Sequence, residues 1–230
     1  DGIRSPIVLK KSPLLGMRSD DLAAVVIKEL VARNPKISKK LVEDLVVGCA
    51  FPEGPQGMLM AKGISILADL PTESAAKIVN RFCGSSMDAT HQISSRIETG
   101  DITVGIAAGV EDMFSIPMGG FNPDFNPTLA EQEYYIGMGE TAENLAHQLD
   151  ISREDQESFA IHSHEKALTT ISQGRFENEI IPIDFNDATV STDEGPREPN
   201  IEKIISLEPA FDADGTITAA TSSPVSIGAA

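Results

Sequence analysis

One cysteine occurs in a setting that could do chemistry. The stretch Val79–Met87 reads VNRFCGSSM, and Cys83 lies between an arginine and a Gly-Ser-Ser run. An apolar run gives way here to a helix start made of small residues, so Cys83 is expected at a strand-to-helix turn. Unpaired backbone N–H groups at the start of a helix stabilise a thiolate. The pattern favours a nucleophilic thiol for acyl transfer, with the same N–H groups facing the oxygen of the attacked carbonyl.

The alternative for Cys83 is a small buried hydrophobic residue, because free cysteines are among the most buried residues. Cys49 fits that description better. It lies inside LVVGCAF, with apolar neighbours on its N-terminal side, and is expected to be an inert core residue. Two cysteines this far apart do not form a disulfide framework, so we expect a reducing, cytoplasmic compartment.

The histidines do not form an obvious metal site or a base for Cys83. His162 and His164 are two residues apart on an expected helix, so they point to different faces and cannot act as an i, i+4 ligand pair. His91 follows Cys83 by about two helical turns, too far to serve as its base. We therefore expect no metal ion and no bound redox cofactor.

The composition of the chain limits the classes of molecule that it is expected to bind. The net charge of −17 argues against nonspecific nucleic-acid binding, although Lys and Arg gather in the first forty residues on what is expected to be a solvated face. No apolar run approaches the roughly 18 residues of a membrane span. No signal peptide opens the sequence, and both of its ends look like interruptions of longer segments.

Helical and extended patterns alternate through the first half of the chain. Helices are expected at 20–33, 38–44, 58–70 and from after Cys83 to about 99, and strands at 45–51, 73–82 and 102–113. This alternation predicts a mostly parallel α/β sheet covered by helices on both faces.

The second half has a different character. From Met118 the sequence leaves the sheet pattern and becomes largely helical, with a helix start at Ser152 and Asp155 and a helix end at Gly174. An irregular segment is expected over 179–200, before a final segment at 216–226. The overall expectation is an α/β core of about 115 residues that carries a long helical insertion.

Four ordered motifs, VNRFCGSSM, AAGVEDMFSIPM, MGETAENLA and EPAFDADGTITAATSSPVSIGAA, resemble those of thiolases, and most closely the 3-ketoacyl-CoA thiolases of fatty-acid β-oxidation. DGIRSP and SREDQESFAIHSHEKA extend the resemblance over nearly the whole chain. It implies a thiolase-like α/β domain at 1–117 with a truncated first strand, a CoA-binding loop domain at 118–215, a return strand at 216–230, and no C-terminal thiolase domain.

The reaction implied by this resemblance is cleavage of a 3-ketoacyl-CoA by free CoA through an acyl-cysteine intermediate. Cys83 would be the nucleophile, and its backbone N–H would contribute to an oxyanion hole. The resemblance implies no permanently bound cofactor, because coenzyme A and acyl-CoA are substrates. It also implies a homodimer or homotetramer, with a hydratase/dehydrogenase subunit as a further candidate partner.

Five residues match positions that contact CoA in the family. Met138 would line the acyl and pantetheine pocket, Phe211 would pack against the pantetheine or adenine, and Ser223 would hydrogen-bond the pantetheine. Arg197 would meet the nucleotide part, where a guanidinium suits a phosphate, and Leu207 would complete the site. Without the resemblance, each residue has a purely structural alternative. Met138 and Phe211 could equally be core residues, Ser223 a turn residue and Arg197 an exposed charge.

Other parts of the family pattern do not occur in the sequence. The Gly-His-Pro histidine that activates the nucleophile, the Cys-x-Gly acid–base cysteine and the Asn-Glu-Ala-Phe segment belong to the second half of thiolases. The resemblance therefore covers about the first three fifths of a thiolase, and we expect the chain alone to turn over very little, since a lost general base costs about 10²–10⁴-fold in rate. Ile227 occupies a position that is usually aspartate, where the carboxylate is expected to organise the junction between the halves.

Two rival functions remain open. One is an acetoacetyl-CoA thiolase that runs in the condensing direction. The other is a noncatalytic CoA-binding or assembly module that kept the fold. A nucleotide-binding domain is disfavoured, because no G-x-G-x-x-G follows the first strand.

Overall fold

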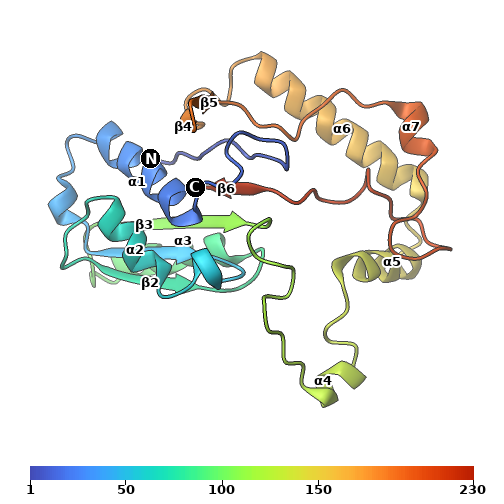
Figure 1. The fold of residues 1–230 in the computed structure, drawn as a ribbon, viewed down its shortest axis with the longest axis horizontal. Helices are drawn as coiled ribbons and strands as arrows, with labels where there is room; N and C mark the ends of the chain where they lie inside the picture. The colour runs from blue at the N-terminus through green and yellow to red at the C-terminus, as the bar shows by residue number, and fades with distance from the viewer. The chain divides into compact units, whose positions relative to one another are not determined.

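The computed structural model describes all 230 residues, and they form two compact units (Figure 1). The first unit contains Asp1–Asn122, Glu177–Gly195 and Val225–Ala230, and the second contains Pro123–Phe176 and Pro196–Pro224. Residues 177–195, which we placed in the loop domain from the sequence, lie in the first unit.

The helices and strands of the first unit are α1 (Ser19–Arg33), η1 (Lys39–Leu41), β1 (Asp44–Gly48), η2 (Gly54–Gln56), α2 (Met60–Leu67), β2 (Ala75–Val79), α3 (Ser85–Glu98), β3 (Gly105–Asp112), β4 (Ile183–Phe185), β5 (Ala188–Val190) and β6 (Ile227–Ala229). The helices of the second unit are α4 (Pro127–Glu131), α5 (Met138–Gln148), α6 (Arg153–Ser172) and α7 (Ile201–Ile205). No helix combines the length and the apolar character needed to cross a membrane.

The main sheet of the first unit has the strand order β2-β1-β3-β6. β1 runs parallel to β2 and to β3, whereas β6 runs antiparallel to β3. Every residue of β1 is buried, because the strand has a neighbour on each side and helices above and below. The predicted mostly parallel α/β class is confirmed.

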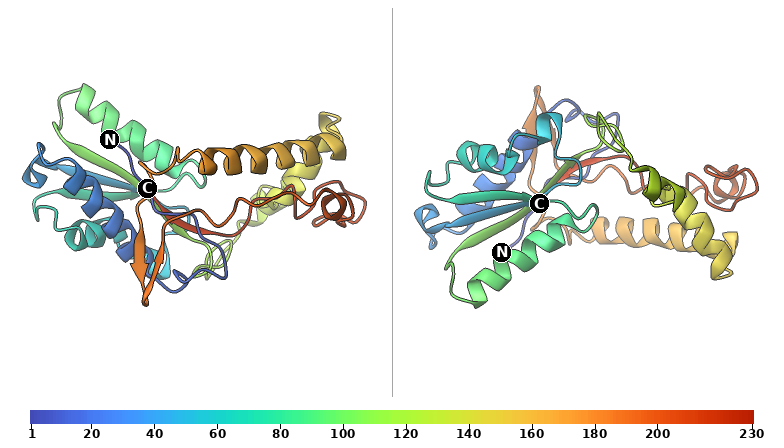
Figure 2. Two further views of the ribbon diagram at one scale, coloured as in Figure 1. Left: turned by 90° about the horizontal axis from the view of Figure 1, so that it is seen from above. Right: turned by 90° about the horizontal axis from the view of Figure 1, so that it is seen from below.

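Helices cover both faces of this sheet (Figure 2). Leu45 and Val47 pack in the cluster that includes the buried side chains of α1 and α2, while Val46 packs with Ala89 and Ile93 of α3. Neighbouring strand residues point to opposite faces, so α3 lies on the face opposite to α1 and α2. The turn that begins α3 is thereby held against the sheet.

The sequence explains where α1 begins and ends. Asp20 and Asp21 lie in its first turn and Arg33 in its last, so the charges complement the helix dipole. Its apolar stripe is buried, and Leu22 is only 1% exposed. The helix ends at Arg33, and Asn34, the residue that follows it, precedes a proline, as predicted from the sequence.

Two elements differ from the sequence-based expectation. The helix expected at 38–44 is only the short 3₁₀ helix η1, because Val42 is already buried where the chain turns into β1. The segment expected to be irregular contains the β4–β5 hairpin. Its two connecting residues, Asn186 and Asp187, have φ of 48° and 60°, which is the backbone of a two-residue hairpin turn.

The final strand is also shorter than expected. Residues 216–226 do not form a strand, and β6 starts at Ile227. Ile227 is 1% exposed and exchanges two backbone hydrogen bonds of 3.0 Å with Val8. The isoleucine therefore fills the apolar core of the first unit at the position where an aspartate was expected from the resemblance.

The second unit is organised by α5 and α6. The hydroxyl of Ser152 accepts the N–H of Asp155 at 3.1 Å and caps α6, and Gly174 with φ of 66° follows its end, both as predicted. The carboxylate of Glu143 on α5 accepts the backbone N–H groups of Thr216 and Ile217, at distances between 2.7 and 3.0 Å. This carboxylate fixes the extended segment that leads away from the unit.

Candidate active site

Cys83 lies on the turn between β2 and α3, at the edge of the sheet where the parallel strands end. It is exposed, so the alternative of a buried core cysteine does not hold in this structure. In parallel α/β sheets, ligands bind outside the carboxyl ends of the strands. The turn is therefore placed where the fold commonly carries chemistry.

The turn is tightly hydrogen-bonded. The hydroxyl of Ser85 accepts the N–H of Arg81 at 2.8 Å and donates to the carbonyl of Phe82 at 2.6 Å. Phe82 has φ of 44°, a left-handed conformation that is strained for a residue with a side chain. Strained residues that the surrounding structure holds in place cluster at functional sites, and this one directly precedes the thiol.

The backbone N–H groups around Cys83 differ in whether they already have an acceptor. The N–H groups of Gly84 and Ser85 donate to the carbonyls of Arg81 and Phe82, both at 3.0 Å. The N–H of Cys83 is not engaged by any of these bonds. It can therefore donate to an oxygen of a bound molecule, as the oxyanion-hole expectation requires.

Two glycines allow α3 to approach the sheet closely. Gly48 of β1 and Gly109 of β3 are register partners on neighbouring strands. A Cβ atom on Gly48 would lie 2.4 Å from the backbone nitrogen of Ser86, and one on Gly109 would lie 1.9 Å from its Oγ. The first turn of α3 thus rests on this glycine pair. We missed the pair in the sequence, where its signal is a glycine near the end of each apolar run, in LVVG and AAG.

The charge nearest to the thiol in sequence is Arg81. Its Nε lies 3.6 Å from the carboxylate of Asp88, and the arginine side chain is 71% exposed. An exposed pair of this kind contributes little to stability. Arg81 remains accessible to solvent beside the turn.

Cys49 differs from Cys83 in its burial and in the surroundings of its thiol. It is 1% exposed, as predicted, and it follows the last residue of β1. Burial, together with the negative charge of Glu111, raises the pKa of the Cys49 thiol from 9.0 to about 12. The thiol is therefore neutral at physiological pH and is not the reactive cysteine.

A buried polar network lies beside Cys49, and sequence reasoning missed it. Gln56 is fully buried; its amide donates to Glu111 Oε1 at 2.6 Å and accepts the N–H of Asp112 at 2.6 Å. Glu111 Oε2 accepts the N–H of Ala50 at 2.6 Å. These bonds join the loop after β1 to the end of β3.

Among the candidate CoA residues, the structure brings Met138 and Phe211 to the same place within the second unit. Met138 begins α5, and the ring of Phe211 packs on the next residue, Gly139, where a Cβ atom would lie 2.1 Å from the ring. Met138 is 74% exposed and Phe211 is 51% exposed, so neither is a core residue in this structure. The pair forms an accessible apolar surface that could contact a ligand.

The other three candidates have separate surroundings. The N–H of Arg197 donates to His164 Nδ1 at 3.3 Å, and the carbonyl of Leu207 accepts from Arg153 at 2.6 Å. Ser223 is exposed. Their contact with CoA stays a prediction. His162 instead hydrogen-bonds within α6, to the carbonyl of Ser158, so the two histidines face different surroundings as predicted.

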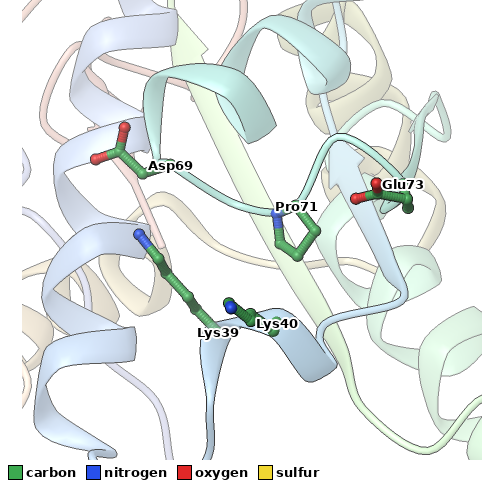
Figure 3. Close-up of a pocket in the computed structure, with 5 residues that line it drawn as sticks. All are labelled: Lys39, Lys40, Asp69, Pro71 and Glu73. Atoms are coloured by element: carbon green, nitrogen blue, oxygen red, sulfur yellow. The ribbon is translucent and has the colours of Figure 1, made fainter.

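A surface depression lies elsewhere on the first unit (Figure 3). Lys39, Lys40, Asp69, Pro71 and Glu73 line it, and the amino group of Lys39 points toward Asp69. These residues precede β1 and β2, so the depression lies at the amino edge of the sheet, opposite to the Cys83 turn. It is not part of the candidate active site.

Comparison with known proteins agrees with this geometry. The whole chain, residues 1–230, matches the family model described as the thiolase N-terminal domain. The chain belongs to the thiolase family. It is 39% identical over 246 residues to a 3-ketoacyl-CoA thiolase of Bacillus subtilis (strain 168), covering 100% of this chain and 63% of that protein.

Two further thiolases show the same pattern. The chain is 42% identical over 239 residues to a 3-ketoacyl-CoA thiolase of Marinomonas sp. (strain MWYL1) and 40% identical over 240 residues to one of Shigella sonnei (strain Ss046). In each case the match covers 100% of this chain, with 61% and 62% of the relative. This thiolase chain therefore spans about three fifths of the length of the curated relatives, as expected from the motifs.

Proposed function

We propose that the protein to which this chain belongs is an acyltransferase that cleaves a 3-ketoacyl-CoA with CoA, with Cys83 as the nucleophile. The observation that carries the proposal is the exposed Cys83 thiol at the start of α3, directly after the strained Phe82. Membership of the thiolase family and the similarity to 3-ketoacyl-CoA thiolases support the same chemistry.

The proposed reaction has two steps. The Cys83 thiolate attacks the keto carbon of the substrate, the bond between the keto carbon and the α carbon breaks, and acetyl-CoA leaves after its α carbon takes up a proton. The thiolate of free CoA then attacks the acyl-cysteine, forms a shortened acyl-CoA and releases the Cys83 thiolate. The positive end of the α3 dipole stabilises this thiolate, and the Cys83 N–H stabilises negative charge on the attacked oxygen.

This chain would supply the nucleophile and the CoA contacts. Met138 and Phe211 offer an accessible apolar surface for the pantetheine or acyl chain, and the Arg197 guanidinium offers a donor for phosphate. The resemblance assigns the activating histidine and the second cysteine to segments that do not occur among these residues. No resident metal or redox group takes part in the proposed steps.

Acyl transfer to Cys83 tests the proposal directly. The full-length protein is mixed briefly with a 3-ketoacyl-CoA in the absence of free CoA, and its intact mass and peptide map are recorded. We expect one acyl group on Cys83, none in Cys83→Ala, and an adduct that still maps to Cys83 in Cys49→Ala. An adduct on Cys49, or no adduct with a folded protein, contradicts the proposal and favours a noncatalytic CoA-binding module.

A series of acyl-chain lengths distinguishes the degradative thiolase from the acetoacetyl-CoA thiolase. Acylation by long 3-ketoacyl-CoA substrates as well as by acetoacetyl-CoA supports the degradative activity. Acylation by acetoacetyl-CoA alone supports the condensing enzyme.

A further inference from the structure

A single side chain connects the Cys83 turn to the neighbouring loop. Asn80 lies between the end of β2 and the turn. Its Oδ1 accepts the N–H of Phe82 at 2.9 Å, and its Nδ2 donates to the carbonyl of Ala50 at 2.9 Å. The two ends of one planar amide therefore fix the turn to the loop that follows β1.

Ala50 is itself held in place. Its N–H donates to Glu111 Oε2 at 2.6 Å, and Glu111 Oε1 accepts from the buried amide of Gln56 at 2.6 Å. Gln56 is anchored in turn by the N–H of Asp112. The carbonyl that Asn80 binds is thus positioned by hydrogen bonds that lead back to the end of β3.

The bond to Phe82 acts where the backbone is strained. Phe82 has φ of 44° and Cys83 follows it, so the direction in which the thiol points depends on the Phe82 dihedrals. Such a conformation persists only when its surroundings hold it. The Asn80 oxygen supplies one holding contact, and the Phe51 ring, with its centroid 6.0 Å from that of Phe82, supplies another.

We infer that Asn80 is a positioning residue for the Cys83 thiol, and that Glu111 supports it through the peptide of Ala50. The inference rests on the proposed function and deepens it. The side chain must accept at one end and donate at the other. An asparagine amide does both, whereas a serine can accept the N–H two residues on but cannot also reach the carbonyl of Ala50.

The test measures single-turnover acylation of Cys83 in the full-length protein. The 3-ketoacyl-CoA concentration is varied, and the variants are Asn80→Ala and Asn80→Ser. We expect Asn80→Ala to lower the limiting acylation rate constant by about tenfold, since the strain at a residue such as Phe82 corresponds to a population change of this size. The half-saturating substrate concentration should not change, and Asn80→Ser should restore part of the rate.

The matched control is Asn34→Ala. The Asn34 amide also donates to a backbone carbonyl, that of Leu30 at 2.8 Å, but it follows α1 at the amino edge of the sheet. We expect its acylation rate to equal that of the wild type. A rate loss in Asn34→Ala equal to that in Asn80→Ala overturns the inference, because the loss would then follow from general destabilisation.

The Glu111 contribution is tested by a double-mutant cycle. If Glu111 acts through Ala50 and Asn80, Glu111→Gln slows acylation in the wild-type background but has no further effect in Asn80→Ala. Equal effects in both backgrounds overturn the role of Glu111.

The remaining outcomes separate the two proposals. If wild-type Cys83 is not acylated, the proposed function fails before any variant is compared. If the wild type is acylated and folded Asn80→Ala reacts at the same rate, the inference alone fails. Circular dichroism establishes folding, and if Asn80→Ala does not fold, a wild-type rate in Asn80→Ser overturns the inference.

Discussion

At the scale of single residues, the two cysteines show how position decides reactivity. Cys49 directly follows β1, under the polar network of Glu111 and Gln56, and is 1% exposed. Cys83 follows β2 at a distance of a short turn and is exposed at the start of a helix. Burial and a nearby carboxylate keep the first thiol protonated, whereas the second thiol is exposed to solvent at the start of α3. The same side chain therefore has opposite surroundings a few residues beyond neighbouring strands.

The raised pKa of Cys49 predicts a loss of stability in alkali. The thiol pKa is about 12 in the folded protein and 9.0 in its ordinary state, so above about pH 9 the unfolded chain loses this proton first and the free energy of unfolding falls. Between about pH 9 and 10.5, we expect the free energy of unfolding of Cys49→Ala to fall by about 2 kcal/mol less than that of the wild type. Urea unfolding at several pH values measures the difference, and parallel curves for the two proteins would contradict the assignment.

The sequence allowed Cys83 to be proposed as the nucleophile, but not Asn80 and Glu111, which we infer to position it. Small residues and a helix start surround Cys83 within a few positions, so local pattern was sufficient. Asn80 donates to the carbonyl of Ala50, 30 positions earlier in the sequence, and Glu111 accepts the N–H of Ala50, 61 positions earlier. These partners meet only because β1 lies between β2 and β3 in a particular register, which the residue pattern does not specify.

At the scale of elements, α3 and the sheet are matched by shape. The helix starts over Gly48 and Gly109, which leave space where any other residue would place a Cβ atom. Ile93 and Ala89 then continue the contact with Val46 along the helix. The position of the Cys83 turn therefore follows from the packing of α3 as well as from its own hydrogen bonds.

Gly48→Ala is predicted to disturb this contact. The new Cβ would lie 2.4 Å from the Ser86 backbone nitrogen and 2.5 Å from the Ser85 carbonyl carbon, so α3 must move. We expect a loss of about 1–3 kcal/mol in the free energy of unfolding and slower acylation of Cys83.

Gly109→Ala should cost less unfolding free energy than Gly48→Ala, because its new Cβ atom meets the side chain of Ser86, which can rotate. Gly63→Ala is the control: it lies in α2 with nothing within 4 Å, and it should stabilise by up to about 1 kcal/mol. Chemical denaturation measures all three variants. A Gly48→Ala protein as stable as the wild type would show that α3 does not depend on the close approach.

Element prediction succeeded where a pattern was long enough to show a period. α1, α3 and β3 were found close to their bounds, because each repeats its apolar spacing over at least eight residues. β4 and β5 have three residues each, too few for an alternation to be visible, and their hairpin was missed. At η1 the sequence predicted a longer helix than the structure contains. The reason is that the burial of Val42 depends on the sheet, which the local sequence does not reveal.

At the scale of the whole molecule, the first unit is assembled from three separate parts of the chain. Arg4 joins two of them: its guanidinium donates to both carboxylate oxygens of Asp193 at 2.8 and 2.9 Å, and to Glu179 at 2.8 Å. Asp193 also accepts the N–H of Ile7 at 2.8 Å. These side chains stabilise a unit that the chain leaves and re-enters.

Asp193→Asn is predicted to weaken this junction. Burial alone would raise the pKa of Asp193, but the hydrogen bonds from Arg4 and from the Ile7 N–H, with the Arg4 charge, lower the pKa below 3.8. The carboxylate therefore contributes stability above its unfolded pKa, and the contribution is lost as the pH falls through the folded pKa.

We expect Asp193→Asn to lose about 2 kcal/mol of unfolding free energy at about pH 6, and the difference from wild type to shrink below about pH 4. Asp69→Asn, at an exposed pair with Lys28, is the control and should unfold like the wild type. A difference that does not depend on pH would contradict the role of the charge.

The pairing of the first residues with the last has a consequence for synthesis. Ser5 hydrogen-bonds Ala229 and Val8 hydrogen-bonds Ile227, and both bonds between Ser5 and Ala229 join residues 224 positions apart. At about 5–20 residues per second, a ribosome delivers β6 on the order of ten seconds or more after residues 5–8 have emerged. During that interval β3 has an uncovered edge, which can pair with another nascent chain. The interval before β6 emerges is therefore when this part of the protein most needs a chaperone.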